Sequence, residues 1–172
     1  MHFEKTVSIL AIIISMVAIT VSIWQGVETR DHNKLSLAPY LQATPTLGGD
    51  KRDGIYLSND GTGTAFIKNA TISVKNHKYD LTSNNWYKIY DDLNLTKGCF
   101  SESWLPIDST LKAAEEISLI SITRADKPEC YLQVLKLVTA EGLRLSIEYT
   151  SVYKEVYVYS KVVSIRIKDQ GS

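Results

Sequence analysis

An uncharged apolar run near the start of the chain constrains the fold more than any other feature. Thr6 to Trp24 reads TVSILAIIISMVAITVSIW, in which serine and threonine are the only polar residues. As a helix with a rise of about 1.5 Å per residue, this run is about 28 Å long, close to the roughly 30 Å hydrocarbon core of a bilayer. The run therefore predicts one membrane-spanning helix surrounded by membrane lipid.

The chief alternative to an anchor is a cleaved signal peptide, which has a shorter apolar core followed by small residues. Here the bulky Ile23 and Trp24 occupy that place, so we favour an uncleaved helix. Its orientation is less constrained. Lys5 precedes the run and Arg30 and Lys34 follow it, which favours a cytoplasmic C-terminal domain. A β-rich domain with two cysteines instead suits the outside of the membrane, and there we expect it.

The serines and alanines of the apolar run share one stripe of the helix. They recur at spacings of three and four residues, whereas the other faces carry large aliphatic side chains. Small side chains at this period let helices approach closely, and hydroxyl groups can bond across the contact. The stripe predicts an interface for self-association, although five such residues can also align by chance. Its members are Ser8, Ala11, Ser15, Ala18 and Ser22.

The chain divides into four predicted segments. Residues 1–5 form an N-terminal tail, 6–24 the membrane helix, 25–34 a juxtamembrane stalk and 35–172 a β-rich domain. The whole chain carries 19 Lys and Arg against 19 Asp and Glu. No basic stripe interrupts this balance, which argues against a nucleic-acid partner.

Alternating apolar and polar residues dominate the domain and predict strands. A bulge near Asn69 would reconcile the pattern of the third strand, and residues 59–63 form a turn. The expected strands are 34–41, 54–59, 65–74, 104–107, 116–123, 143–149 and 156–167, with a loop at 43–53.

Two short helices interrupt these strands. One lies near 86–93 with Ser83 or Asn84 as its N-cap. The other begins with Asp126 as N-cap and Pro128 in its first turn, and it buries Leu132, Leu135 and Val138 or Thr139. The chain is therefore mainly β, an N-terminal transmembrane helix followed by an antiparallel β-sandwich. An immunoglobulin-like topology is one arrangement that fits.

Cys99 and Cys130 are the two cysteines of the chain. In an oxidising compartment they can pair and stabilise the fold, whereas in the cytoplasm they stay ordinary thiols. No CxxC motif or neighbouring histidine accompanies them, so we expect no metal site.

Patterns that resemble catalytic motifs lack the context that the chemistry needs. Tyr157 and Lys161 have the spacing of a short-chain dehydrogenase pair, but no glycine-rich turn of a nucleotide-binding fold precedes them. Adjacent acidic residues at 91–92 and 115–116 point to different faces of a strand or helix. We therefore expect no catalytic residues, no cofactor and no enzyme activity.

Three patterns in the chain resemble a known group. They are Arg30-x-His32-Asn33-x-Leu35-Ser36-x-x-Pro39, Gly54-Ile55-x-Leu57-x-Asn59-x-Gly61-x-Gly63-x-Ala65-x-Ile67 and Ile147-x-Tyr149-x-Ser151-x-Tyr153. They resemble uncharacterised bacterial single-pass membrane proteins with an N-terminal helix and a C-terminal β-rich domain. In that group proline often follows the second glycine, where this chain has Thr64. The resemblance implies a bacterial inner membrane and no catalytic activity.

These features together predict a membrane-anchored, non-enzymatic β-sandwich that binds an unknown protein partner or senses the cell envelope. Two alternatives stay open. The chain could be a membrane effector of a bacterial stress or phage-defence system whose helices associate. It could also be an enzyme whose site is assembled from loops without a recognised motif.

Overall fold

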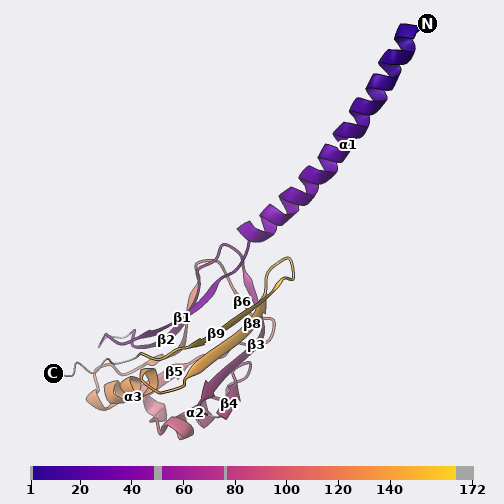
Figure 1. Ribbon diagram of the computed structural model, residues 1–172. Helices are drawn as coiled ribbons and strands as arrows, with labels where there is room; N and C mark the ends of the chain where they lie inside the picture. Colours follow the sequence, from indigo (N-terminus) through magenta and orange to yellow (C-terminus); the bar gives the residue numbers. More distant parts are fainter. Residues whose placement is uncertain (1, 49–51, 76, 166–172) are drawn as a thin grey trace, which may run out of the picture. The chain divides into compact units, whose positions relative to one another are not determined.

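The computed structural model describes residues 2–48, 52–75 and 77–165. The chain falls into two units, Met1–Ser36 and Leu37–Ser172. Figure 1 shows the first as a helix and the second as a β-rich domain, and each is described by itself.

The first unit is the single helix α1 (His2–Ser36). Its stretch Thr6–Ser36 is long and apolar enough to cross a membrane, a property that a signal sequence near an N-terminus also has. The predicted tail and stalk both belong to this helix from His2 onward. The strand predicted at 34–41 is wrong, because helical hydrogen bonding continues through the polar residues to Ser36. Pro39 then disfavours a helical backbone at Ala38, and the chain becomes extended.

The domain contains two antiparallel sheets. In the first sheet the strands lie in the order β1-β2-β7-β5, and in the second in the order β4-β3-β8-β9, with β6 beside the start of β3. The first sheet consists of β1 (Leu41–Thr46), β2 (Gly54–Asn59), β7 (Glu116–Ile122) and β5 (Phe100–Glu102). The second consists of β4 (His77–Asp80), β3 (Ala65–Val74), β8 (Arg144–Thr150), β9 (Val156–Val162) and β6 (Thr110–Leu111).

This strand order is that of an immunoglobulin-type sandwich. Numbered as A to G, the first sheet has the order A-B-E-D and the second C′-C-F-G. The predicted antiparallel β-sandwich behind an N-terminal apolar helix is thus confirmed, and its topology is immunoglobulin-like. Two helices are inserted into this plan. Helix α2 (Trp86–Leu93) lies between β4 and β5, and α3 (Pro128–Val138) lies between β7 and β8.

The strands follow the alternating pattern where one face is buried. Strands β2 and β3 have the predicted bounds, and a register shift between Ile67 and Asn69 confirms the expected bulge. A second shift, opposite Ile55, lets Leu119 and Ile120 of β7 both reach the core. Bulges of this kind re-aim side chains without ending the strand.

The sequence did not predict the short edge strands. The loop predicted at 43–53 begins later than expected, because β1 runs to Thr46. Strands β4, β5 and β6 are too brief to show a pattern, and residues 104–107 form no strand. Instead the Leu105 N–H donates to the Leu81 carbonyl across the loop. The last strand ends at Val162, so its predicted extension is wrong over residues 163–165, and residues 166–167 lie outside the described part of the chain.

The buried face of α3 agrees only in part with the predicted one. Val138 is buried as predicted, whereas Leu135 is half-buried and Leu132 is 58% exposed. The other buried residues are Cys130, Val134 and Leu137. Apolar residues surround most of this helix, so its sequence permits more than one buried face and tertiary contacts select among them. Neither helix has a side-chain N-cap, and the cap positions are Asn85 and Lys127 rather than the predicted residues.

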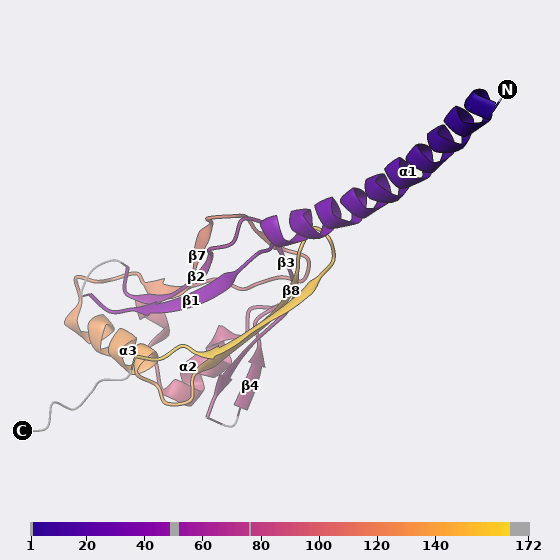
Figure 2. The ribbon, with the colours of Figure 1, turned by 45° about the horizontal axis from the view of Figure 1, so that its top comes forward.

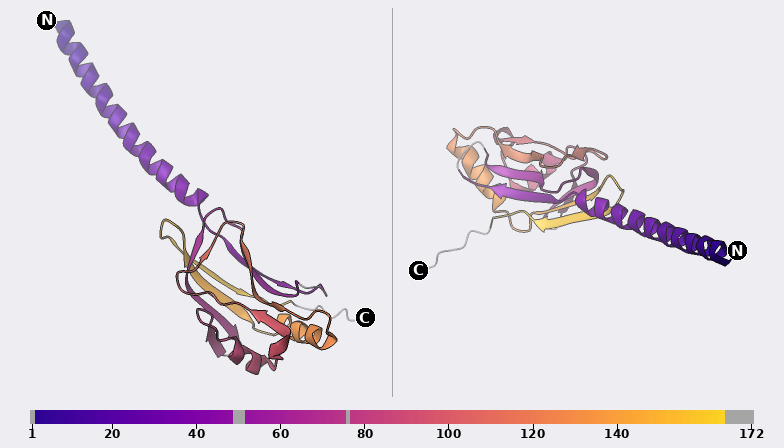
Figure 3. Two further views of the ribbon diagram at one scale, coloured as in Figure 1. Left: turned by 180° about the vertical axis from the view of Figure 1, so that it is seen from behind. Right: turned by 90° about the horizontal axis from the view of Figure 1, so that it is seen from above.

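A single core lies between the sheets and extends under the two helices. Trp86 at the start of α2 is fully buried, and its indole N–H donates to the Ser103 carbonyl at 2.7 Å. Figure 2 shows α2 and α3 at one end of the domain, and Figure 3 shows the same arrangement from behind and from above. The helices therefore close that end of the core.

Asn59 closes the opposite end. Its side chain is fully buried. Its Oδ1 accepts hydrogen bonds from the N–H groups of Tyr40 and Gly61, at 3.0 and 3.1 Å. Its Nδ2 donates to the carbonyls of Gly63 and Leu111, at 2.8 and 3.0 Å. The amide thus uses its full bonding capacity and joins the segment before β1, the β2–β3 turn and β6.

Two glycines let the chain pass close to this amide. A Cβ atom on Gly63 would overlap the Leu37 carbonyl, and one on Gly61 would overlap the backbone of Ala38 and Tyr40. Both positions therefore require glycine for space.

We predict that Asn59→Ala lowers the free energy of unfolding by about 2 to 4 kcal/mol, because buried backbone groups lose their partners. Denaturant unfolding of the full chain in detergent, followed by tryptophan fluorescence, measures the change. Asn84→Ala, at an exposed loop position, is the matched control and should change little. Equal stability of the two variants would contradict this role.

Candidate functional site

Strand β9 ends the second sheet and carries a row of exposed side chains. Side chains Val156, Val158, Ser160 and Val162 are all exposed, and Val158 retains 68% of its accessible surface. We call these four residues the β9 edge face. Figure 3 shows β9, the yellow strand, at the margin of the domain.

The backbone of this strand has a definite polarity. The Val163 N–H donates to the Leu143 carbonyl and the Ser151 N–H to the Glu155 carbonyl, within the antiparallel register of β8 and β9. Antiparallel hydrogen bonds alternate between residues, so the odd-numbered residues of β9 direct their N–H and C=O groups to β8. The even-numbered residues of the β9 edge face direct theirs outward. Within the described residues these outward groups have no backbone partner.

The opposite sheet protects its neighbouring edge. In β1 the outward donors are Leu41 and Ala43, whose N–H groups donate to the hydroxyls of Tyr149 and Tyr159 at 3.4 and 3.2 Å. The next outward position is Pro45, which has no N–H. Burial raises the pKa of both tyrosines, so the hydroxyls remain protonated at neutral pH. Strand β1 therefore offers no free donor along this edge among the described residues.

The two remaining sheet edges are short. Strand β5 contains three residues, and β4 contains four, with the sequence His-Lys-Tyr-Asp. Short and charged edges resist pairing with another strand. Strand β6, beside the start of β3, contains only two residues. Among the described edge strands, only β9 is both long and rich in valine.

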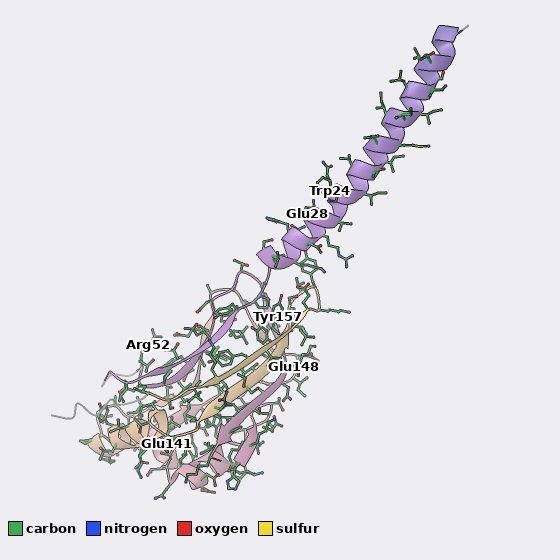
Figure 4. The ribbon with its side chains drawn as sticks, viewed as in Figure 1. Trp24, Glu28, Arg52, Glu141, Glu148 and Tyr157 are labelled. Carbon is green, nitrogen blue, oxygen red and sulfur yellow. A yellow bond between two sulfur atoms is a disulfide. The ribbon has the colours of Figure 1, made fainter. Side chains whose placement is uncertain are left out.

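Tyr157 and Lys161 share the side of β9 that alternates with the β9 edge face, where Tyr157 is half-buried and Lys161 is exposed. The Tyr157 ring stacks on Tyr149 with centroids 5.5 Å apart, and its hydroxyl donates to Glu155. The Lys161 Nζ lies 5.8 Å from the Tyr159 ring centroid. Figure 4 labels Tyr157 on β9 and Glu148 on the adjoining strand β8, and the register places their side chains on opposite faces of the sheet. The four-residue spacing of Tyr157 and Lys161 therefore follows from their places on one side of a strand.

Cys99 and Cys130 form a disulfide in the structure, with their Cα atoms 5.1 Å apart. Cys99 ends the short 3-10 helix before β5, and Cys130 lies in the first turn of α3. Both are buried. The bond ties the helix that connects β7 and β8 to the edge of the first sheet.

The predicted small-residue stripe lies on α1, where all five side chains are exposed. Two of its hydroxyls bond within the helix. Ser15 Oγ donates to the Ala11 carbonyl and Ser22 Oγ to the Ala18 carbonyl, each at 2.8 Å. These donors are therefore already used in the single copy, and self-association through this stripe stays a prediction.

Sequence reasoning missed a polar cluster between β4 and α2. The Tyr79 hydroxyl donates to Asp92, and His77 Nδ1 lies 2.7 Å from the same carboxylate oxygen. The Asp92 hydrogen bond, with burial, raises the pKa of Tyr79 to about 12, and the bonds from Tyr79 and His77 lower the pKa of Asp92. In the sequence, the cluster could have been recognised from His77 and Tyr79, which are two residues apart and so share one face of a strand.

No family model, curated protein or solved structure matches this chain. The resemblance drawn from the sequence therefore remains a prediction.

We predict that Asp92→Ala returns the pKa of Tyr79 from about 12 toward its ordinary value of 10.0. The contact with Asp92 stabilises the fold below pH 10 and is lost as the pH rises through the raised pKa. Ultraviolet titration of tyrosine, with Tyr79→Phe as the reference, isolates this one group. Asp91→Ala is the matched control, and an unshifted Tyr79 in Asp92→Ala would contradict the assignment.

We predict that replacing both cysteines by serine lowers the free energy of unfolding by about 3 to 4 kcal/mol, because the disulfide closes a separation of 31 residues. Denaturant titration of the full chain under oxidising conditions measures the loss. Ser101→Ala, on the neighbouring exposed surface of β5, is the control. A loss smaller than that caused by Ser101→Ala would refute the stabilising role.

Proposed function

We propose that this chain is a single-pass protein of a bacterial inner membrane whose β-sandwich stands outside the cytoplasm. There the sandwich binds another polypeptide, or senses the envelope through such binding, without catalysing a reaction. The observation that carries this proposal is the β9 edge face.

Two features support the proposed location. The apolar part of α1 has the length of a membrane span. The Cys99–Cys130 disulfide suits an oxidising compartment, because cytosolic thiols are kept reduced. The disulfide argument opposes the weak cytoplasmic preference of Arg30 and Lys34, and we give it more weight because a reduced pair would forfeit several kcal/mol of stability.

The β9 edge face supports the proposed binding. A strand edge offers backbone donors and acceptors to an extended segment, and alternate side chains supply specificity. Soluble proteins normally protect such edges with charge, proline or short length. The protected edge of β1 and the polar edge of β4 show that this domain uses those devices elsewhere. Strand β9 has seven residues, three of them valine, and Lys161 as its one charged residue, and it is thus suited to recruit another strand.

We predict that a cysteine introduced at Lys154, an exposed turn residue, reacts with a membrane-impermeant maleimide in intact bacterial cells. The native cysteines are paired and do not compete. A cysteine introduced at Lys5, on the other side of the apolar run, is the control and should react only after permeabilisation. The reverse labelling pattern would place the domain in the cytoplasm and overturn the proposed location.

A further inference from the structure

We propose that β9 pairs antiparallel with β9 of a second copy of this chain and joins two five-stranded sheets into one. This inference rests on the proposed function, in which β9 is the binding edge, and it identifies the partner as the protein itself.

The backbone restricts how two copies can pair. The outward N–H and C=O groups belong to even-numbered residues, so each must face an even-numbered residue of the other copy. A two-fold arrangement then centres on a residue of β9 and not between two residues. Centred on Tyr159, all seven residues of β9, from Val156 to Val162, are paired. Centred on Val158, residues 161 and 162 lie opposite the turn. The longer pairing is the arrangement that we propose.

The side chains are complementary to themselves in this register. On the exposed face, Val156 stands opposite Val162, and Val158 opposite Ser160. On the inner face, Lys161 stands opposite Tyr157, so the two lysines do not face one another. Apolar and aromatic cross-strand pairs are favourable, whereas like charges directly opposite each other are not. The same strand thus supplies both halves of a compatible interface.

The pairing also closes at two copies. An isologous contact uses the same patch on both partners and leaves no second copy of that patch open. The far edge of the extended sheet is formed in each copy by β4, which is short and charged, and by the two-residue strand β6. Strand β1 of the other sheet is capped by tyrosine hydroxyls. Further strands therefore find no equivalent edge among the described residues.

Membrane attachment suits a contact of this size. A single pair of seven-residue strands buries less than the about 1,200 Å² of a stable soluble interface. Membrane anchors confine the copies to one plane, and this confinement raises the effective concentration at which two β9 strands meet. This argues for an identical anchored copy rather than a soluble peptide as the occupant.

Site-directed crosslinking of the full chain in bacterial membranes tests the register. Copies with Val156→Cys and copies with Val162→Cys carry different tags and are mixed and oxidised. We expect a mixed disulfide dimer several-fold above that from Val156→Cys mixed with Ser160→Cys. Dominance of the 156–160 product would overturn the register centred on Tyr159. Val152→Cys, at an exposed valine in the turn, is the collision control. If Val152→Cys crosslinks as strongly as the Val156→Cys and Val162→Cys mixture, the products report random collision and the pairing is overturned.

A second variant tests the backbone contact without disturbing the fold. Val158→Pro removes one outward N–H and no hydrogen bond to β8, and proline is tolerated at such edge positions. Each dimer would lose two backbone hydrogen bonds, so the 156–162 crosslink should fall about tenfold or more. Val152→Lys is the matched control and should leave it unchanged. A 156–162 crosslink that persists in Val158→Pro would overturn the inference.

One further outcome separates this inference from the proposed function. A photoreactive residue at position 158 that captures a different polypeptide, in place of a second copy, would overturn the self-pairing. It would leave β9 as the binding edge and the proposed function standing.

Discussion

The buried amide of Asn59 is the interaction on which the start of the domain depends. Its side chain bonds four backbone groups from three segments, and its own N–H and C=O bond the loop before β7 through Glu115 and Ala114. Burying a polar group costs free energy unless all of its hydrogen bonds are made. An arrangement that left the Asn59 amide with fewer hydrogen bonds would therefore be less stable than this one. The amide therefore stabilises the β2–β3 crossing between sheets, and the immunoglobulin-type order follows from where that crossing lies.

Tyrosine hydroxyls make the two neighbouring sheet edges unequal. Tyr149 and Tyr159 belong to the second sheet, yet their hydroxyls satisfy outward donors of β1 in the first. The rings of both tyrosines pack in the core, so these side chains cover none of the outer surface of β9. Protection of β1 thus comes from Tyr149 of β8 and from Tyr159 of β9, the strand whose own edge is left open. This asymmetry leaves β9 with an open edge among the described residues and β1 with a protected one.

Much of the fold was predictable because one face of each long strand is buried. The alternation of Ile55 and Leu57 predicted β2 with its observed bounds, and the broken alternation near Asn69 predicted the bulge of β3. Prediction failed where burial is decided by distant segments. The face of α3 that carries Val134 depends on the sheets and the disulfide beside it, and β6 exists only because β3 lies next to it.

By itself, the sequence determined the apolar helix, the mainly antiparallel β architecture and the turn at residues 59–63, because each depends on local composition or periodicity. Only the tertiary structure decided the strand order, the Cys99–Cys130 pairing and the open edge of β9. These depend on which backbone groups meet across the fold. Val156 and Val158 look like core residues in an alternating strand, but they lie on the face of the second sheet that points away from the core.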